Sequence, residues 1–232
     1  MNSQKKITRA AGLLYLIVVL TGIFSLLYVP SKLFNWNDAV STFNNIRENE
    51  ILFRLGIVAS IVCYIAFLFL PLVLYKLLGP VNKGYAVAMV SLALVSVPVS
   101  LVNLLNKVNI LTLMGNENYV STIPLNELHN NIFLYLDYYE NGITLASIFW
   151  GLWLFPFGYL VYKSGFLPKA LGVILMFGCF GYIINFLGGF LYKGYSDLGI
   201  GGLISVPATL GEIGICLWLL FVGTSRKKTT NS

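Results

Sequence analysis

The chain has 232 residues, of which 57% are hydrophobic and only 10% are charged, and its mean hydropathy is +0.80. A soluble domain carries about 25% charged residues, so this composition excludes a water-soluble globular protein and makes lipid the main solvent. The formal net charge of +6 does not indicate a nucleic-acid partner, because the basic residues are scattered and form no basic face. The cysteines, Cys63, Cys179 and Cys216, lie in separate apolar stretches without metal or redox spacing.

Six apolar segments are long enough to cross a bilayer, because a hydrocarbon core about 30 Å thick takes about 20 residues of helix. The first segment ends without the small-residue cleavage site of a signal peptide, so we expect it to be retained. The predicted fold is an all-α polytopic membrane protein, a six-transmembrane-helix bundle with one short outer amphipathic segment. We expect a single integral membrane domain over residues 1–232, with spans near 10–29, 52–78, 85–114, 132–162, 170–191 and 204–222.

The first two spans are joined by a polar segment from Pro30 to Glu50. In it, Val40, Phe43 and Ile46 recur at near-helical spacing after Asp38, a residue type that caps helices. The segment is interpreted either as a short amphipathic helix on the outer surface or as an ordinary solvated loop.

Ionisable residues in the following spans carry the functional prediction, since a charge at mid-helix costs about 2.5–3.5 kcal/mol on insertion scales. Asn103, Asn106 and Lys107 have the spacing of one helix face, and Asp137 and Glu140 lie three residues apart on the next span. We predict that these groups line an outward-facing polar vestibule above an apolar floor; the alternative is that they reach water at the lipid headgroups. The candidate ligand-binding residues are Arg54, Asn103, Asn106, Lys107, Asp137, Glu140, Asn185 and Glu212.

Glu212 lies near the middle of the sixth span, where its own side chain is too short to reach water. It is either a ligand- or proton-binding group, or a neutral carboxyl that hydrogen-bonds two helices brought close by Gly211 and Gly214. His129 is the only histidine, and the chain offers too few nitrogen or sulfur ligands for a metal. The sequence therefore predicts no metal site and no cofactor.

Basic residues near the span ends predict the orientation, because cytoplasmic segments carry an excess of Lys and Arg. With the N-terminus inside, the outer loops hold only Lys32, Arg47 and Lys193, and no acidic residue falls in a cytoplasmic segment. We expect a cell (inner) membrane protein with both termini in the cytoplasm. The basic residues placed on that side are Lys5, Lys6, Arg9, Lys76, Lys83, Lys163, Lys169, Arg226, Lys227 and Lys228.

Several blocks of sequence resemble a family of multi-pass bacterial membrane proteins, domain of unknown function 4386. The most specific block is GYLVYKSGFLPKALGVIL at Gly158–Leu175, because a generic apolar helix would not reproduce its polar letters. The resemblance implies a membrane protein but no catalytic or binding residues. The other blocks are AGLLYLIVVLTGIFS at Ala11–Ser25, LFRLGI at Leu52–Ile57 and PATLGEIGICLWLLFVG at Pro207–Gly223.

Three functions remain open from the sequence. The first is binding or transport of a small molecule or ion through the polar vestibule. The second is a structural, sensory or stress-related membrane component without small-molecule chemistry. The third is a lipid-modifying enzyme that uses His129, Asp137 and Glu140 as acid–base groups. The expected partners are membrane lipids and the small ligand, and the sequence does not indicate an oligomeric state.

Overall fold

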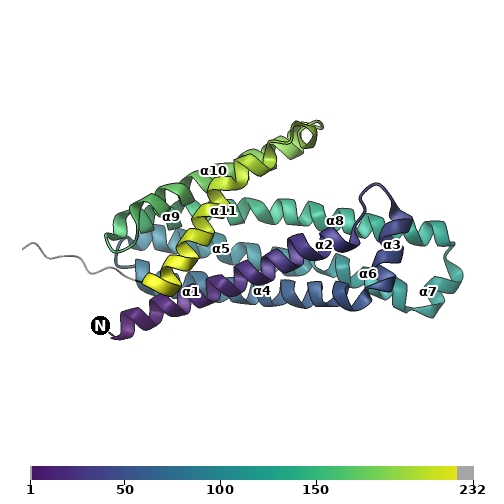
Figure 1. The fold of residues 1–232 in the computed structure, drawn as a ribbon, viewed down its shortest axis with the longest axis horizontal. Helices are drawn as coiled ribbons and strands as arrows, with labels where there is room; N and C mark the ends of the chain where they lie inside the picture. The colour runs from purple at the N-terminus through teal and green to yellow at the C-terminus, as the bar shows by residue number, and fades with distance from the viewer. Residues whose placement is uncertain (1, 224–232) are drawn as a thin grey trace, which may run out of the picture. The chain divides into compact units, whose positions relative to one another are not determined.

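The computed structural model describes residues 2–223, and within that range the chain forms helices and no strand (Figure 1). Arg226, Lys227 and Lys228 of the predicted cytoplasmic end lie outside the described residues. The helices in chain order are α1 (Asn2–Ile23), α2 (Val29–Leu33), α3 (Ala39–Glu48), α4 (Glu50–Leu78), α5 (Lys83–Asn103), α6 (Leu105–Gly115), α7 (Glu117–Thr122), α8 (Leu125–Leu152), α9 (Leu154–Ser164), α10 (Lys169–Leu191) and α11 (Gly201–Leu217). Short π-helical turns follow α1 (η1, Phe24–Tyr28) and α11 (η3, Trp218–Val222), and a 3-10 turn (η2, Ser196–Leu198) precedes α11.

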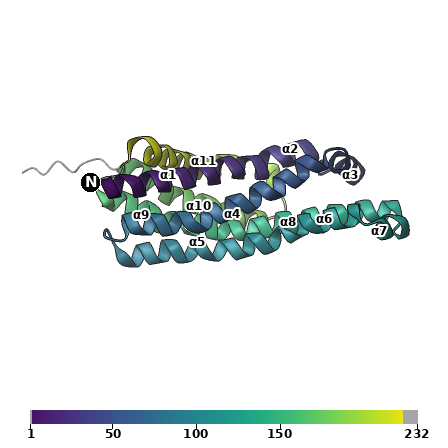
Figure 2. The same ribbon diagram turned by 90° about the horizontal axis from the view of Figure 1, so that it is seen from below.

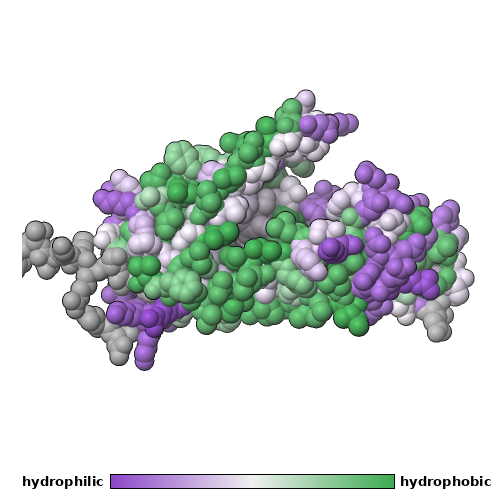
Figure 3. Space-filling view, in the orientation of Figure 1, coloured by the Kyte–Doolittle hydropathy of each residue, from purple (hydrophilic) through white to green (hydrophobic). Residues whose placement is uncertain are grey.

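Six helical segments of the described chain are long and apolar enough to cross a membrane. Large apolar side chains lie on the surface, with Leu191 75% and Phe221 74% exposed, as expected of a surface that faces lipid. In the face drawn in Figure 3, apolar residues predominate and hydrophilic residues gather over α3. The all-α polytopic fold is confirmed, and the chain is a multi-pass membrane protein; that it forms a single domain remains a prediction. The six spans are Gln4–Leu33, Glu50–Leu78, Lys83–Gly115, Leu125–Ser164, Lys169–Leu191 and Gly201–Val222.

By their contacts the described residues divide into two compact units. Unit 1 comprises residues 2–16, 66–97 and 145–223, and unit 2 comprises residues 17–65 and 98–144. Four of the long helices, α1, α4, α5 and α8, contribute one part of their length to each unit. Each unit has its own way of packing.

Unit 1 is held together by close approaches at glycines. α10 packs against both α9 and α11, and the three helices lie side by side in Figure 1. A Cβ on Gly158 would stand 2.5 Å from the carbonyl oxygen of Gly172, and one on Gly178 would stand 2.7 Å from the Ala208 Cα. The start of α1 lies beside the end of α11 (Figure 2), where Gly12 faces the Leu220 backbone. Small residues thus bring the backbones together, as is common where lipid supplies no hydrophobic driving force between helices.

The fourth span is not one uninterrupted helix. α8 ends at Leu152 and α9 begins at Leu154, two residues before Pro156. Proline has no N–H to donate to the carbonyl four residues earlier, which here belongs to Leu152, so the break has a direct cause. Trp153, at the break, is fully buried and stacks on Phe157 with ring centroids 5.1 Å apart. The same span begins at Leu125 rather than near residue 132, because polar residues extend its first turns.

Unit 2 is built around large apolar side chains. Its core includes residues from α3, α4, α6 and α8, among them Phe43, Ile46, Phe53 and Ile110. The amphipathic helix predicted in the first connection is present as α3, and the Asp38 carboxylate accepts hydrogen bonds from the backbone nitrogens at its start. The alternative of a solvated loop for the whole connection is wrong, because α2 already extends the first span to Leu33 and only residues 34–38 separate it from α3.

The apolar face of α3 differs from the predicted one at a single position. Phe43 and Ile46 are buried as expected, whereas the side chain of Val40 is exposed. Thr42 takes the buried place instead, and its hydroxyl donates a hydrogen bond to the Asn35 carbonyl oxygen at 2.9 Å. The helix therefore packs its apolar face into unit 2.

Candidate functional site

A stripe of buried polar side chains runs through the end of α5 and the start of α6. Ser100, Asn103 and Lys107 are all buried, and their spacing of three and four residues keeps them on one side of the chain. The helix is interrupted between them, since α5 ends at Asn103 and α6 begins at Leu105. All three belong to unit 2.

Lys107 is the central residue of this stripe. Its side chain is 1% exposed, and its Nζ lies 3.8 Å from the ring centroid of Tyr139 and 5.7 Å from that of Phe34. Within residues 2–223, Nζ has no hydrogen-bond partner and no ion pair, although Glu140 lies within electrostatic range. A desolvated cation–π contact is worth about 2 kcal/mol, whereas removing an ammonium from water costs several kcal/mol. The aromatic rings therefore offset only part of the cost of burying a charged Lys107.

Hydroxyl groups from three helices lie close to one another, and the ring of one of these residues, Tyr139, lies beside Lys107 Nζ. Tyr139 Oη, Tyr64 Oη and Ser100 Oγ are buried, and none makes a hydrogen bond of good geometry to another described residue. Tyr64 lies within reach of both Tyr139 and Ser100, and Tyr139 lies within reach of Ser60, whose own hydroxyl donates to the Gly56 carbonyl at 3.0 Å. Buried polar groups normally have partners, and these hydroxyls can partner one another, so the group that lacks an explanation is the Lys107 ammonium.

An amide bridge holds the cluster in place. Asn103 Nδ2 donates to the Tyr139 carbonyl oxygen at 2.8 Å, and Asn106 Nδ2 donates to Asn103 Oδ1 at 3.0 Å. Gly142 makes the bridge possible, because a Cβ there would collide with the Asn103 amide. We define the Lys107 cluster as Lys107, Asn103, Asn106, Ser60, Tyr64, Ser100, Tyr139 and Glu140.

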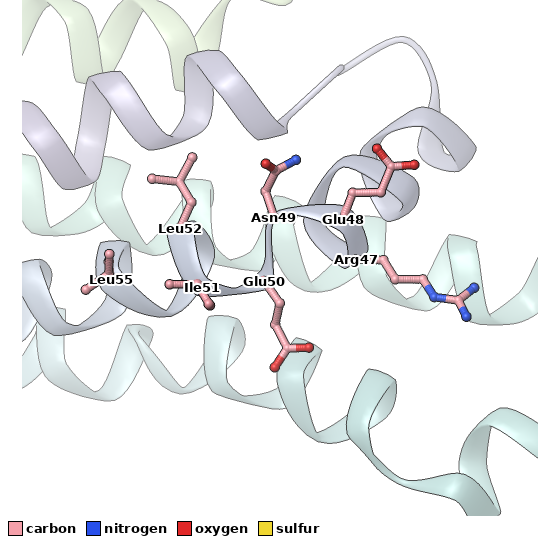
Figure 4. Close-up of a pocket in the computed structure, with 7 residues that line it drawn as sticks. All are labelled: Arg47, Glu48, Asn49, Glu50, Ile51, Leu52 and Leu55. Atoms are coloured by element: carbon pink, nitrogen blue, oxygen red, sulfur yellow. The ribbon is translucent and has the colours of Figure 1, made fainter.

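Two predicted site residues of unit 2 lie outside this cluster. The Arg54 guanidinium donates to the Glu50 carboxylate at 2.6 Å, one helical turn away, and both side chains are about half exposed. Arg54 is thus not the partner of Asp137, which is exposed on α8. Glu50 also borders an open depression of about 540 Å³ at the junction of α3 and α4 (Figure 4). Its charged side chains point in different directions, so it does not form a convergent site.

The remaining two predicted residues belong to unit 1. The Tyr15 hydroxyl donates to Glu212 Oε1 at 3.2 Å, and Tyr182 also lies within electrostatic range of this carboxyl. Gly211 and Gly214 do allow close packing, since a Cβ on Gly214 would stand 2.7 Å from Leu171 of α10. Asn185 has its amide nitrogen and oxygen occupied by the residues that surround the start of α11, namely Gly201, Ser205 and Tyr195.

The comparison with protein families matches residues 10–223 to one family, described as domain of unknown function DUF4386. The chain belongs to the DUF4386 family. A relative from Archaeoglobus fulgidus, described only as an uncharacterized protein, is 33% identical over 104 residues. The match covers 45% of this chain and 57% of the relative, so the chain spans little more than half of that protein's length. No solved structure matches the chain.

His129 of this DUF4386 protein lies inside α8, because the fourth span begins at Leu125 and not near the expected residue 132. Its ring is buried and packs on Phe43 with centroids 4.6 Å apart, and Nε2 has no partner in the described part of the chain. Among residues 2–223, no three His, Cys, Asp or Glu side chains are grouped so that they could hold a metal. The acid–base set proposed for a lipid-modifying enzyme thus contains a buried histidine and an exposed Asp137.

Sequence reasoning did not assign Tyr64, Tyr139, Ser60 and Ser100 to the site of this DUF4386 protein. A signal was present, because Ser60 and Tyr64 are four residues apart and Ser100 continues the Asn103–Lys107 face. What the sequence cannot supply is that these faces of α4, α5 and α8 meet.

Proposed function

We propose that this DUF4386 protein binds a small molecule or ion at the Lys107 cluster, as a ligand-binding or transport protein. The observation that carries the proposal is a lysine that is 1% exposed and has no hydrogen-bond or ionic partner in the described chain. Polar groups of α4, α5, α6 and α8 belong to the same cluster, as at sites where a few placed polar groups orient a ligand. Ionisable residues inside membrane spans commonly mark ligand or ion pathways.

A purely structural role explains this lysine less well. A lysine that only joined helices would be expected to donate to a carbonyl, amide or carboxylate, as Asn103 and Asn185 do. Leaving a buried polar group unpaired costs about 1–3 kcal/mol, and more for a charged one. A bound ligand would supply the missing partners.

The test is a ligand screen on the full chain purified in detergent. Thermal unfolding is followed with anionic, cationic and neutral small molecules, for the wild type, Lys107→Met and the surface variant Arg54→Gln. A ligand at about 100 times its Kd stabilises the protein by about 2.7 kcal/mol. We expect such a shift in the wild type and in Arg54→Gln, and its loss in Lys107→Met. The proposal would be wrong if no compound of the three charge classes shifted the unfolding temperature, or if the shifts were equal in the three proteins.

We also propose the finer location of the protein. The distribution of basic residues supports a cell (inner) membrane protein with cytoplasmic termini, lipids as partners and no nucleic acid. In intact cells, a membrane-impermeant thiol reagent should label an exposed Asn37→Cys variant and leave an exposed Asn82→Cys variant unlabelled. The reverse labelling pattern would show that the orientation is opposite to the proposed one.

A further inference from the structure

We infer that the ligand of the Lys107 cluster is a small anion, and that Glu140 lowers the affinity for it. This inference rests on the function proposed above and specifies its ligand class. It follows from the hydrogen-bonding chemistry of the unpartnered groups and from the position of the nearest acid.

The buried atom of the cluster that lacks any partner in the described chain, Lys107 Nζ, is purely a hydrogen-bond donor. A lysine ammonium has three N–H donors and no acceptor, and each tyrosine or serine hydroxyl has one O–H donor. In this site Lys107 Nζ has no partner among the described residues, whereas the hydroxyls of Tyr64, Tyr139 and Ser100 lie within reach of one another. The complement of a buried ammonium with free N–H donors is a group with negative charge and several acceptor positions, because charge-assisted hydrogen bonds are the strongest ones available.

The Lys107 ammonium argues against a cationic ligand, whereas the neighbouring Glu140 weakens the binding of an anion. A cation at the cluster would face the Lys107 ammonium, whose Nζ already lies over the Tyr139 ring. Glu140 is half-buried and acts electrostatically on Lys107, yet it makes no ion pair with this lysine in the part of the chain described. The carboxylate therefore reduces the positive potential at Nζ and leaves its donors available. An anion at Nζ would be repelled by Glu140.

The burial of Lys107 limits the size of the anion. Its side chain is 1% exposed, and the rings of Tyr139 and Phe34 flank Nζ at 3.8 Å and 5.7 Å. Phe34 is half-buried and packs edge-on against exposed Trp36, with ring centroids 5.7 Å apart. A halide or an anion of a few atoms fits these neighbours better than a large organic acid.

The experiment titrates sodium salts of chloride, bromide, nitrate, acetate and phosphate against the full chain in detergent. Ionic strength is held constant with the bulky anion gluconate, and the unfolding temperature is recorded. We expect a saturable rise for at least one small anion in the wild type and none in Lys107→Met. Glu140→Gln should lower the half-saturating concentration about tenfold, since it removes a nearby like charge. Asp137→Asn is the matched control, because this exposed acid on the next turn should change it less than about twofold.

A second variant keeps the inference falsifiable if Lys107→Met does not fold. Tyr139→Phe retains the ring beneath Nζ and removes one donor, so it should weaken anion binding about fivefold. Equal anion responses in wild type and Lys107→Met would mean simple screening and would overturn the inference. If no anion raises the unfolding temperature but a cationic or neutral compound does so in a Lys107-dependent way, the anion class is overturned and the proposed function stands. If no compound of any charge class raises the unfolding temperature, both the inference and the proposed function are overturned. An unchanged anion affinity in Glu140→Gln would overturn the role of Glu140.

Discussion

The two units of this protein differ in how the polar side chains inside their spans are partnered. In unit 1 the Glu212 carboxyl accepts a hydrogen bond from Tyr15, and Asn185 is fully occupied by its neighbours. In unit 2 the buried Lys107 has aromatic rings beside it but no hydrogen-bond partner within residues 2–223. Helix packing is stabilised when a polar group has a hydrogen-bond partner. A buried polar group without a partner destabilises the fold, so its presence calls for another explanation. This difference is the reason for proposing the ligand site in unit 2.

The two units also differ in how their helices pack. Unit 1 brings backbones together at glycines such as Gly158 and Gly172. Unit 2 has a core of large side chains that encloses polar groups as well. Substitutions should therefore have different effects in the two units. Added side-chain volume at the glycines should destabilise unit 1, whereas replacing Lys107 should not destabilise unit 2.

The largest expected effect comes from replacing the buried lysine. Lys107→Met keeps the length of the side chain and removes the charge, and replacing buried ionic groups with apolar ones stabilises proteins by about 1–4 kcal/mol. We expect the free energy of unfolding of the ligand-free protein to rise, as measured by denaturant titration in detergent. Lys193→Met, on an exposed lysine, should change it by less than about 0.5 kcal/mol. A clear loss of stability in Lys107→Met would instead favour the structural role and remove the contrast between the units.

A somewhat smaller effect of opposite sign is expected in unit 1 from Gly158→Ala. The added Cβ would stand 2.5 Å from the Gly172 carbonyl oxygen, a backbone atom that cannot move away alone. Overpacking of this kind costs about 1–3 kcal/mol, even though alanine favours the helix. Gly189→Ala in α10 is the control, because a Cβ there meets no atom within 4 Å. The same unfolding titration reports both variants, and equal stabilities would contradict glycine-mediated packing.

The smallest effect should come from the hydrogen bond between Tyr15 and Glu212. Tyr15→Phe removes one buried donor and should lower the free energy of unfolding by about 1 kcal/mol. In a double-mutant cycle with Glu212→Gln, a coupling of about 0.5 kcal/mol or more is expected if the two side chains act together. Ligand binding should be unchanged in both variants. Loss of anion binding in Tyr15→Phe would place part of the site in unit 1.

Much of the architecture follows from local sequence. The apolar segments predict the six spans because membrane insertion depends on the summed hydropathy of consecutive residues. Asp38 predicts the start of α3 because a cap acts on the next few backbone N–H groups. Where local reasoning failed, as at the start of the fourth span, polar residues continued a helix beyond its apolar part. Hydropathy alone does not report such an extension.

The membrane class, the six spans and the shared face of Ser100, Asn103 and Lys107 were determined by the order of the residues, since helical periodicity and hydropathy are properties of neighbouring positions. Only the tertiary structure decided which polar groups have partners. Tyr15 and Glu212 are 197 positions apart and bond, whereas Arg54 pairs with Glu50 and Lys107 is left with aromatic rings. Pairing depends on how distant helix faces meet, and that arrangement arises from the packing of the whole chain.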